Sequence, residues 1–263
     1  MILYTVIPCY NEEKVLPETI RVMTEKYESL IQRKMISKKS RVLFVDDGSF
    51  DDTWETICEA HKKNEIFCGI KLSRNRGHQN ALLAGLMEAK EFCDAAISVD
   101  ADLQDDIDAI DEMVEKFGEG CDIVYGVRNK RSTDRFMKRF TAEGYYHLME
   151  FFGTHIIFNH ADYRLMSKKA LEALSEFDET NLFLRGMVPM LGFKTAKVYY
   201  ERRERFAGES KYSVGKMIDL AWNGITSFSV KPVDMILFAG VLIAGFSVLA
   251  MLVLLVLTIF GVL

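Results

Sequence analysis

A chain of 263 residues, 49% of them hydrophobic, suits one domain of ordinary size plus additional segments. Its formal net charge of −5 at pH 7 gives no general attraction to nucleic acid. The five cysteines lack the spacing of metal or redox sites, so we expect reduced, buried thiols. Acidic residues cluster at 46–52 and 100–106, and basic residues cluster at 128–139 and 202–216. This separation indicates a cation site and an anion site in different places.

Short apolar runs alternate with amphipathic segments through the first half of the chain. The apolar runs predict strands, and the helical spacing of apolar residues predicts helices between them. The expected strands are residues 2–7, 41–45, 69–72, 95–99 and 122–125, and the expected helices are residues 13–35, 51–63, 78–92 and 107–117. Alternating strands and helices predict an α/β fold with right-handed crossovers and a mainly parallel, doubly wound sheet.

The C-terminal segment has the composition of a membrane span. Residues 235–263 contain no charged side chain and are long enough to cross a bilayer as a helix. We therefore expect a transmembrane segment over residues 233–263. Three lysines precede it, namely Lys211, Lys216 and Lys231. By the positive-inside rule, these lysines predict that the preceding domain is cytoplasmic.

Two more helices are predicted in the second half of the chain, at residues 135–152 and 212–230. Both combine apolar and aromatic residues with basic ones, as expected of amphipathic helices at a membrane interface. Ordinary core helices have a similar composition, and this alternative stays open for each helix. The apolar C-terminal run follows the second helix almost directly, which favours the interfacial interpretation.

Three expected strands end in polar sequence at residues 8–12, 46–49 and 100–106. In open α/β sheets, ligands bind beyond the carboxyl ends of the strands. The Asp-Asp-Gly-Ser segment at 46–49 suits a nucleoside pocket, in which carboxylates accept hydrogen bonds from base or ribose and Tyr10 flanks the base. A turn before a capped helix is the alternative. The sequence has no Walker loop and no Gly-x-Gly-x-x-Gly motif, which disfavours P-loop ATPases and dinucleotide-binding proteins.

Asp100 and Asp102 follow an expected strand directly. Two carboxylates in this position can converge on Mg²⁺ or Mn²⁺, with substrate phosphate oxygens completing the coordination. A solvated acidic turn that caps the next helix is the alternative, because an isolated Asp-x-Asp is common. Capping suits Asp105 and Asp106 better, since they come at the start of the expected helix.

In combination, these motifs resemble those of the family 2 inverting glycosyltransferases. The matching segments are residues 6–12, 45–49, 100–105, 126–128, 162–166 and 205–212, in the order found in the family. Within the family the chain is most similar to polyprenyl-phosphate hexose synthases, which include dolichyl-phosphate mannose synthases and bactoprenol glucosyltransferases. The resemblance covers nearly the whole chain.

The resemblance implies a Rossmann-like GT-A glycosyltransferase domain over residues 1–212. Its nucleotide-sugar half is expected at about 1–127 and its acceptor half at about 128–212. An interfacial juxtamembrane helix at 213–232 and the transmembrane segment then follow. Bacterial members usually carry two C-terminal transmembrane helices, whereas this sequence contains one such apolar run.

The resemblance also implies roles for individual residues. The expected donor-binding residues are Pro8, Tyr10, Glu12, Val45, Asp47, Asp100, Ala101 and Gln104. Asp102 is expected to ligate the metal, and the expected catalytic residues are Asp102, Asp162 and Arg164. The expected phosphate-binding residues are Arg128, Arg205 and Lys211. Without the resemblance, a solvated basic loop would be the preferred interpretation of Arg205 and Lys211.

The implied reaction transfers a hexose with inversion from a nucleotide-diphosphate sugar to polyprenyl (undecaprenyl) phosphate, using Mg²⁺ or Mn²⁺ to neutralise the leaving diphosphate. A phosphate monoester is largely deprotonated at neutral pH, so a strong general base is less necessary. UDP-glucose is the expected donor, with UDP-N-acetylglucosamine and GDP-mannose as alternatives. The product would be a lipid-linked sugar for cell-envelope glycosylation, made at the cytoplasmic face of the bacterial inner membrane.

Other functions are less consistent with the sequence. A processive polysaccharide synthase would normally add a Gln-x-x-Arg-Trp motif and several more membrane helices, which this sequence does not contain. A soluble or protein acceptor leaves the apolar run unexplained. A non-catalytic nucleotide-sugar sensor would not need both acidic motifs and the basic pair. A homo-oligomer is compatible with the sequence.

Overall fold

The computed structural model describes residues 1–129, 160–177, 182–202 and 231–260. The first three segments belong to one unit, and the last belongs to a second unit. The predicted interfacial helices at 135–152 and 212–230 lie outside the described residues, as do Arg205 and Lys211.

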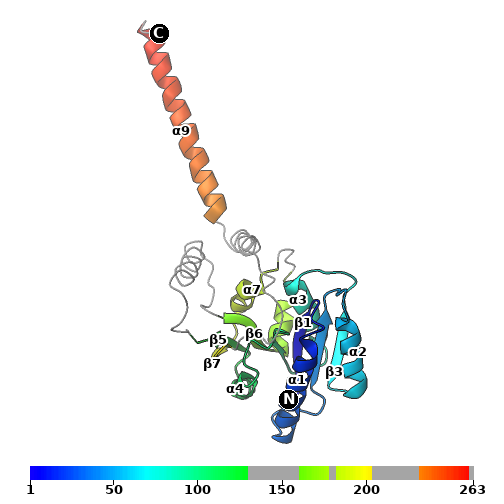
Figure 1. Ribbon diagram of the computed structural model, residues 1–263. Coiled ribbons are helices and arrows are strands. Elements are labelled where there is room, and N and C mark those ends of the chain that lie inside the picture. Colours follow the sequence, from blue (N-terminus) through cyan, green and yellow to red (C-terminus); the bar gives the residue numbers. More distant parts are fainter. Residues whose placement is uncertain (130–159, 178–181, 203–230, 261–263) are drawn as a thin grey trace. The chain divides into compact units, whose positions relative to one another are not determined.

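A seven-stranded sheet forms the centre of the first unit (Figure 1). Its strands are β1 (Leu3–Cys9), β2 (Arg41–Asp46), β3 (Phe67–Lys71), β4 (Ala95–Ser98), β5 (Ile123–Arg128), β6 (His160–Ser167) and β7 (Thr195–Tyr200). Their order across the sheet is β3-β2-β1-β4-β6-β5-β7. Neighbouring strands are parallel except at β6, which is antiparallel to both β4 and β5. The predicted α/β fold with a mainly parallel sheet is therefore confirmed.

Helices connect and cover the strands. They are α1 (Leu16–Gln32), α2 (Thr53–Lys63), α3 (His78–Lys90), α4 (Ala109–Gly118), α6 (Lys168–Leu174) and α7 (Leu184–Met190). The four helices predicted from periodicity are present, with shifted ends. The first is shorter than predicted because Pro17 lies at its N-terminus and Lys34 takes a left-handed conformation with φ 59° just after it. Sequence patterns missed β6, β7, α6 and α7.

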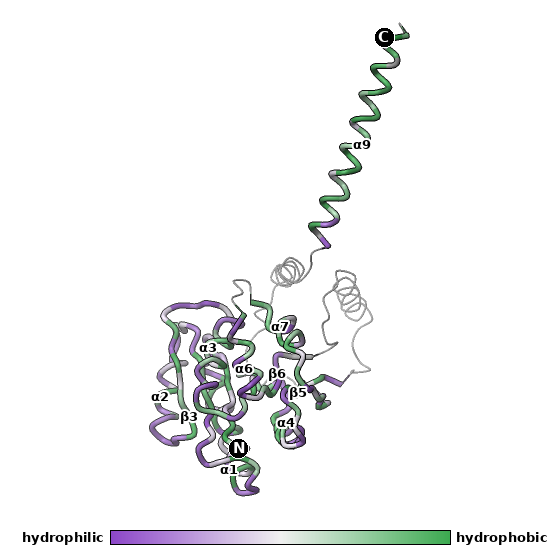
Figure 2. Tube along the Cα trace, turned by 180° about the vertical axis from the view of Figure 1, so that it is seen from behind, coloured by the Kyte–Doolittle hydropathy of each residue, from purple (hydrophilic) through white to green (hydrophobic). Residues whose placement is uncertain are grey.

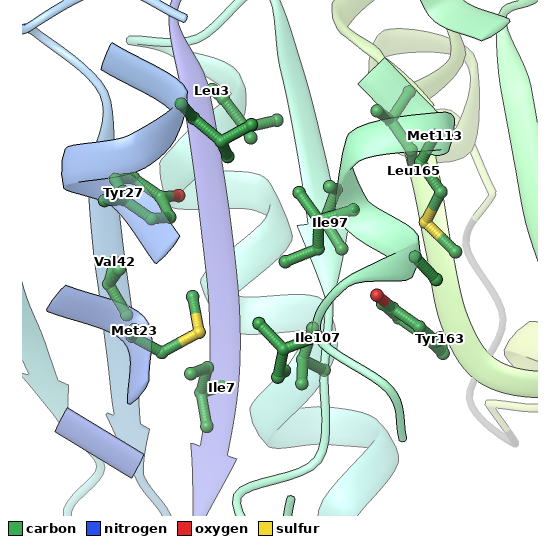
Figure 3. Close-up of a cluster of buried hydrophobic side chains, with 14 of the residues drawn as sticks. Leu3, Ile7, Met23, Tyr27, Val42, Ile97, Ile107, Met113, Tyr163 and Leu165 are labelled. Atoms are coloured by element: carbon green, nitrogen blue, oxygen red, sulfur yellow. The ribbon is translucent and has the colours of Figure 1, made fainter. Parts of the chain in front are cut away.

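One face of the sheet packs against α1, α2 and α4. Leu3 and Ile7 of β1 lie in the same buried cluster as Met23 and Tyr27 of α1 (Figure 3). These side chains are completely buried. The Tyr27 hydroxyl keeps a hydrogen bond by donating to the Arg41 carbonyl oxygen at 2.9 Å. Burial of an aliphatic side chain such as Leu3 or Ile7 contributes roughly 1.5–3 kcal/mol to the stability of the fold. The packing on this face therefore supports the sheet beneath its carboxyl edge.

The opposite face carries α3, which approaches the sheet closely at Gly85. A Cβ at this position would lie 2.4 Å from Val6 Cγ1 and 2.6 Å from Val45 Cγ2. Only glycine allows this distance between helix and sheet. The contact fixes the start of α3, with His78 as its first residue, near the ends of β1 and β2.

Strand order reverses between β1 and β4, because β2 and β3 lie on one side of β1 and the later strands on the other. The ladder between β1 and β4 ends at Val6 and Ser98, whereas β1 stays paired with β2 as far as Cys9 and Asp46. Pro8, which has no N–H to donate, occupies β1 where its pairing with β4 has ended. Open α/β sheets bind ligands at such a switch point.

The described part of the second unit is the helix α9 (Lys231–Ile259). Its 27-residue stretch Val233–Ile259 contains an 18-residue window with a mean hydropathy of 2.8, in which no described side chain is buried. Figure 2 shows hydrophobic residues along nearly its whole length. It is a candidate membrane span by length and composition, in agreement with the predicted transmembrane segment.

Candidate active site

The acidic segment after β4 is held in a tight turn. The Thr19 hydroxyl of α1 donates to the Ala101 carbonyl oxygen at 2.8 Å, and the Gln104 amide donates to Asp102 Oδ1 at 3.1 Å. Leu103 has φ 55°, a left-handed conformation that is uncommon for a residue with a β-carbon. Strain of this kind often accompanies functional turns, and here it leaves Asp100 and Asp102 at the carboxyl edge of the sheet.

Negative charge is concentrated around Asp100. Loss of solvation and three neighbouring carboxylates raise the pKa of Asp100 to about 6, although its side chain is still 39% exposed and His78 opposes the shift. The three neighbours are Asp102, Asp105 and Asp162. A divalent cation would relieve this repulsion, and carboxylate oxygens are the ligands that Mg²⁺ and Mn²⁺ favour.

The described residues contain no group of three or more His, Cys, Asp or Glu side chains arranged to hold a metal. Asp100 and Asp102 nevertheless fit Mg²⁺ or Mn²⁺, which commonly uses one or two carboxylates together with substrate phosphates and water. A protein cage of four ligands is therefore not required at this edge.

The segments after β1 and β2 are joined by reciprocal hydrogen bonds. The Asn11 amide donates to Ser49 Oγ at 2.9 Å, and the Phe50 amide donates to Asn11 Oδ1 at 3.0 Å. The Tyr10 and Phe50 rings meet edge to face with centroids 6.5 Å apart. The Glu12 amide donates to Thr53 Oγ1 at 2.8 Å. This pairing brings Tyr10 and Glu12 close to the end of β2.

Asp47 is almost fully buried and holds the loop before α3. Its Oδ1 accepts a hydrogen bond from the Arg76 amide at 2.7 Å, and its Oδ2 accepts one from the Gly77 amide at 2.9 Å. Gly48, with φ +70°, lies so close to this loop that a Cβ would be 2.6 Å from the Arg74 carbonyl carbon. Pro8 and Val45 are register partners in the adjoining strands, and both are buried. The predicted donor-binding residues therefore gather at one edge of the sheet.

A buried ionic cluster lies at the same edge on β6. Because β6 is antiparallel to β4 and Arg164 pairs with Ser98, Asp162 lies beyond the end of β4, beside the segment that contains Asp100. Asp162 Oδ1 accepts hydrogen bonds from Arg164 Nη2 at 2.8 Å and Arg185 Nε at 3.2 Å. Its Oδ2 accepts from Arg185 Nη2 at 3.0 Å and Gln79 Nε2 at 3.3 Å. Burial alone would raise the pKa of Asp162, but the two arginines hold it well below its usual range.

His78 connects the acidic turn to this cluster. Its Nε2 lies 3.6 Å from Asp100 Oδ1 and 3.9 Å from Asp162 Oδ2. Sequence patterns missed His78, Gln79 and Arg185 as site residues. For the first two, their position at the start of the helix after β3 was an available signal. For Arg185 the sequence offered none, since neither β6 nor α7 was predicted.

Arg128 lies in a second buried polar group. Its Nη2 donates to Asp105 Oδ1 at 3.0 Å, and its Nε donates to the Tyr200 hydroxyl at 3.2 Å. Tyr200 in turn donates to Asp105 Oδ1 at 2.6 Å. The expectation that Asp105 caps the next helix is wrong, because this arginine and tyrosine occupy its buried carboxylate. Asp106 makes the local turn instead, accepting from the Asp108 amide at 3.2 Å.

Gln104 is also engaged by a basic residue, because Arg202 donates a hydrogen bond to its Oε1. The acidic turn therefore contacts β5 and the end of β7 as well as α1. Basic side chains on these elements border the predicted cation site, and the rest of the two basic clusters lies outside the described residues.

The model for the family described as "Glycosyl transferase family 2" matches residues 4–175. This chain is a member of glycosyl transferase family 2. An uncharacterized glycosyltransferase of Bacillus subtilis, YkoT, is 52% identical over 249 residues, covering 95% of this chain and 74% of that protein. The bactoprenol glucosyl transferase of Shigella phage SfV is 37% identical over 245 residues, covering 93% of this chain and 77% of that protein.

The fold agrees with this membership. A mannosyltransferase from Pyrobaculum calidifontis, solved with GDP-mannose and Mn²⁺, has a TM-score of 0.52 and 17% identity. The similarity covers 78% of this chain and 58% of that one. The predicted GT-A fold is confirmed, and the first unit of this glycosyltransferase is the part that contains it.

Proposed function

We propose that this family 2 glycosyltransferase transfers a hexose from a nucleotide-diphosphate sugar to a polyprenyl phosphate. The main supporting observation is the juxtaposition, across His78, of the acidic turn at Asp100 and the arginine cluster around Asp162. A cation site beside an anion site suits a donor diphosphate and an anionic acceptor. The relatives named bactoprenol glucosyl transferase support a polyprenyl acceptor and favour glucose as the sugar.

The donor would lie at the carboxyl ends of β1, β2 and β4. Tyr10, Glu12 and Asp47 belong to the segments that would surround the nucleoside. Asp102, with Asp100 beside it, would hold Mg²⁺ or Mn²⁺, which neutralises charge on the leaving diphosphate. The remaining proposed donor residues, Pro8, Val45, Ala101 and Gln104, support or border the same edge.

The reaction would proceed with inversion at the anomeric carbon. A phosphate oxygen of the acceptor would form the new bond to that carbon as the bond to the donor diphosphate breaks. The nucleoside diphosphate leaves with that electron pair. Because the acceptor phosphate is already largely deprotonated, the chain needs to orient and hold it more than to remove a proton.

The apolar helix α9 fits a lipid acceptor. We propose that α9 anchors the chain, with the catalytic unit on the cytoplasmic side, where Lys231 flanks the apolar stretch. Arg205 and Lys211, which lie outside the described residues, are proposed with Arg128 as phosphate-binding residues. Arg128 would act in company with Asp105 and Tyr200, which orient its guanidinium group.

A donor panel tests this function. The detergent-solubilised chain would be given polyprenyl phosphate, Mn²⁺ or Mg²⁺, and labelled UDP-glucose, UDP-N-acetylglucosamine or GDP-mannose. We expect an acid-labile product that is extracted into organic solvent, made fastest from UDP-glucose. Free sugars and peptides serve as alternative acceptors. Transfer to these acceptors alone, with none to the lipid, would contradict the proposal.

A further inference from the structure

The carboxylate of Asp162 is saturated by hydrogen-bond donors. An ionised carboxylate offers about four acceptor positions on its two oxygens. Asp162 accepts four hydrogen bonds, from Arg164, Gln79 and twice from Arg185. Its side chain is only 8% exposed. A carboxylate so occupied is poorly placed to take a proton or to face a sugar, so its effect on the reaction must pass through the groups that it holds.

Arg185 is the member of this cluster that reaches outward. Its side chain is 36% exposed, whereas that of Arg164 is 1% exposed. Arg185 donates hydrogen bonds from both Nε and Nη2 to the Asp162 carboxylate, and these two bonds fix the orientation of its planar guanidinium group. Asp162 Oδ1 is shared between the guanidinium groups of Arg164 and Arg185, so the cluster brings two cationic side chains next to the site.

Gln79 completes the support of Arg185 from a different element. Its Nε2 donates to Asp162 Oδ2 at 3.3 Å, while its Oε1 accepts from the Leu184 amide at 3.1 Å. Leu184 directly precedes Arg185 at the start of α7. The side chain and the backbone of this arginine are thus both positioned by residues at the edge of the sheet.

We propose that Arg185 binds the phosphate group of the acceptor, and that Asp162 and Gln79 act as positioning residues for it. The inference rests on the proposed function. In an inverting displacement, the nucleophile approaches the sugar on the face opposite the leaving group. The donor diphosphate belongs with the cation site at Asp100 and Asp102, and the arginine cluster lies across His78 from that pair. The partly exposed guanidinium group of Arg185 and its location therefore fit the attacking phosphate.

Steady-state kinetics with the full chain tests the assignment, with the KM for polyprenyl phosphate and the KM for the donor measured separately. Arg185→Gln should raise the acceptor KM about tenfold to a hundredfold, since a hydrogen bond to a charged group is lost. Arg185→Lys keeps the charge but loses the planar fork, so a smaller rise is expected. The donor KM should stay within about twofold, because the cation site is unchanged. Arg21→Gln, which removes an exposed arginine of α1 paired with Glu18 and Glu25, is the matched control.

A double-mutant cycle separates positioning from direct participation. If Asp162 acts through Arg185, then Asp162→Asn combined with Arg185→Gln should be no slower than the more impaired single variant. Thermal melts of each variant, with assays well below the transition, exclude loss of folded protein. Any of three outcomes would overturn the inference. They are losses of rate that multiply in the double variant, an unchanged acceptor KM in Arg185→Gln, and a rise confined to the donor KM. If the wild-type chain transfers no sugar to lipid phosphate, the proposed function, on which this inference rests, is itself wrong.

Discussion

Two aspartates of the site have opposite surroundings. Asp102 is partly exposed on a strained turn, while Asp162 is buried among two arginines and a glutamine. The first lies on the turn that forms the predicted cation site, and the second lies between two arginine side chains. Replacement by asparagine should therefore lower activity at the first position, and both stability and activity at the second.

Asp102→Asn should lower metal-dependent transfer by at least about a hundredfold, because an amide oxygen is a far weaker ligand than a carboxylate. The melting temperature should hardly change, since the turn retains an acceptor for the Gln104 amide. Transfer rates measured over a Mn²⁺ titration provide the test. Asp108→Asn, which removes a mostly exposed carboxylate paired with Lys26, is the control. Near-normal transfer rates in Asp102→Asn would show that Asp102 is not a metal ligand.

Asp162→Asn should destabilise the fold by about 3–5 kcal/mol near neutral pH, because it leaves buried arginine charge uncompensated. The pKa of Asp162 is lower in the folded chain than in the unfolded chain. Its stabilisation is therefore complete above the unfolded value, roughly pH 4, and decreases as the pH falls below that value. Urea melts at about pH 7 and about pH 5 should show the same loss, with a smaller loss at about pH 3. A loss that already shrinks between the first two conditions would contradict this account.

At the level of elements, the sequence predicted those helices and strands whose burial is visible in a local pattern of apolar residues. The apolar runs of β1, β2 and β4 and the periodicity of α1 to α4 are of this kind. The pattern of β6 was hidden because Asp162 and Arg164 interrupt its apolar residues, yet both are buried. Arg185, which bonds to Asp162, comes from α7, where Pro189 weakens a helix prediction. Only the folded chain reveals this pairing, which explains why the acidic half of the site was predictable and Arg185 was not.

The close approach of α3 to the sheet predicts the effect of Gly85→Ala. The new methyl group would collide with Val6 and Val45, and overpacking of this kind costs about 1–3 kcal/mol. This outweighs a helix-propensity gain of about 1 kcal/mol. A displaced α3 would also move His78 and Gln79, so activity should fall together with the melting temperature.

Gly118→Ala is the matched control, because a Cβ at the end of α4 meets nothing within 4 Å. Adding Val6→Ala to Gly85→Ala should restore part of the lost stability. Equal stability of the Gly85→Ala and Gly118→Ala variants would show that α3 can move away from the sheet without cost.

At the level of the whole molecule, the catalytic unit and α9 make separable contributions. Phe246→Arg places a charge at the middle of the apolar stretch, which costs about 3 kcal/mol on insertion scales. Flotation with lipid vesicles should therefore recover less of this variant than of Phe246→Leu. Donor binding should be unchanged, because the residues proposed to bind the donor all lie within the first unit. Equal flotation of the two variants would argue against α9 as an anchor.

The antiparallel strand β6 also restricts which insertions and deletions the protein can tolerate. Tyr163 and Leu165 belong to the apolar cluster beneath the sheet, while Asp162 and Arg164 alternate with them and pair with groups outside that cluster. A single-residue insertion or deletion within β6 would exchange the two sets and bury charges against hydrocarbon. Substitutions can accumulate along the strand one position at a time, but changes of length cannot. Among descendants of this sequence, insertions and deletions should therefore be confined to the segments on either side of His160–Ser167.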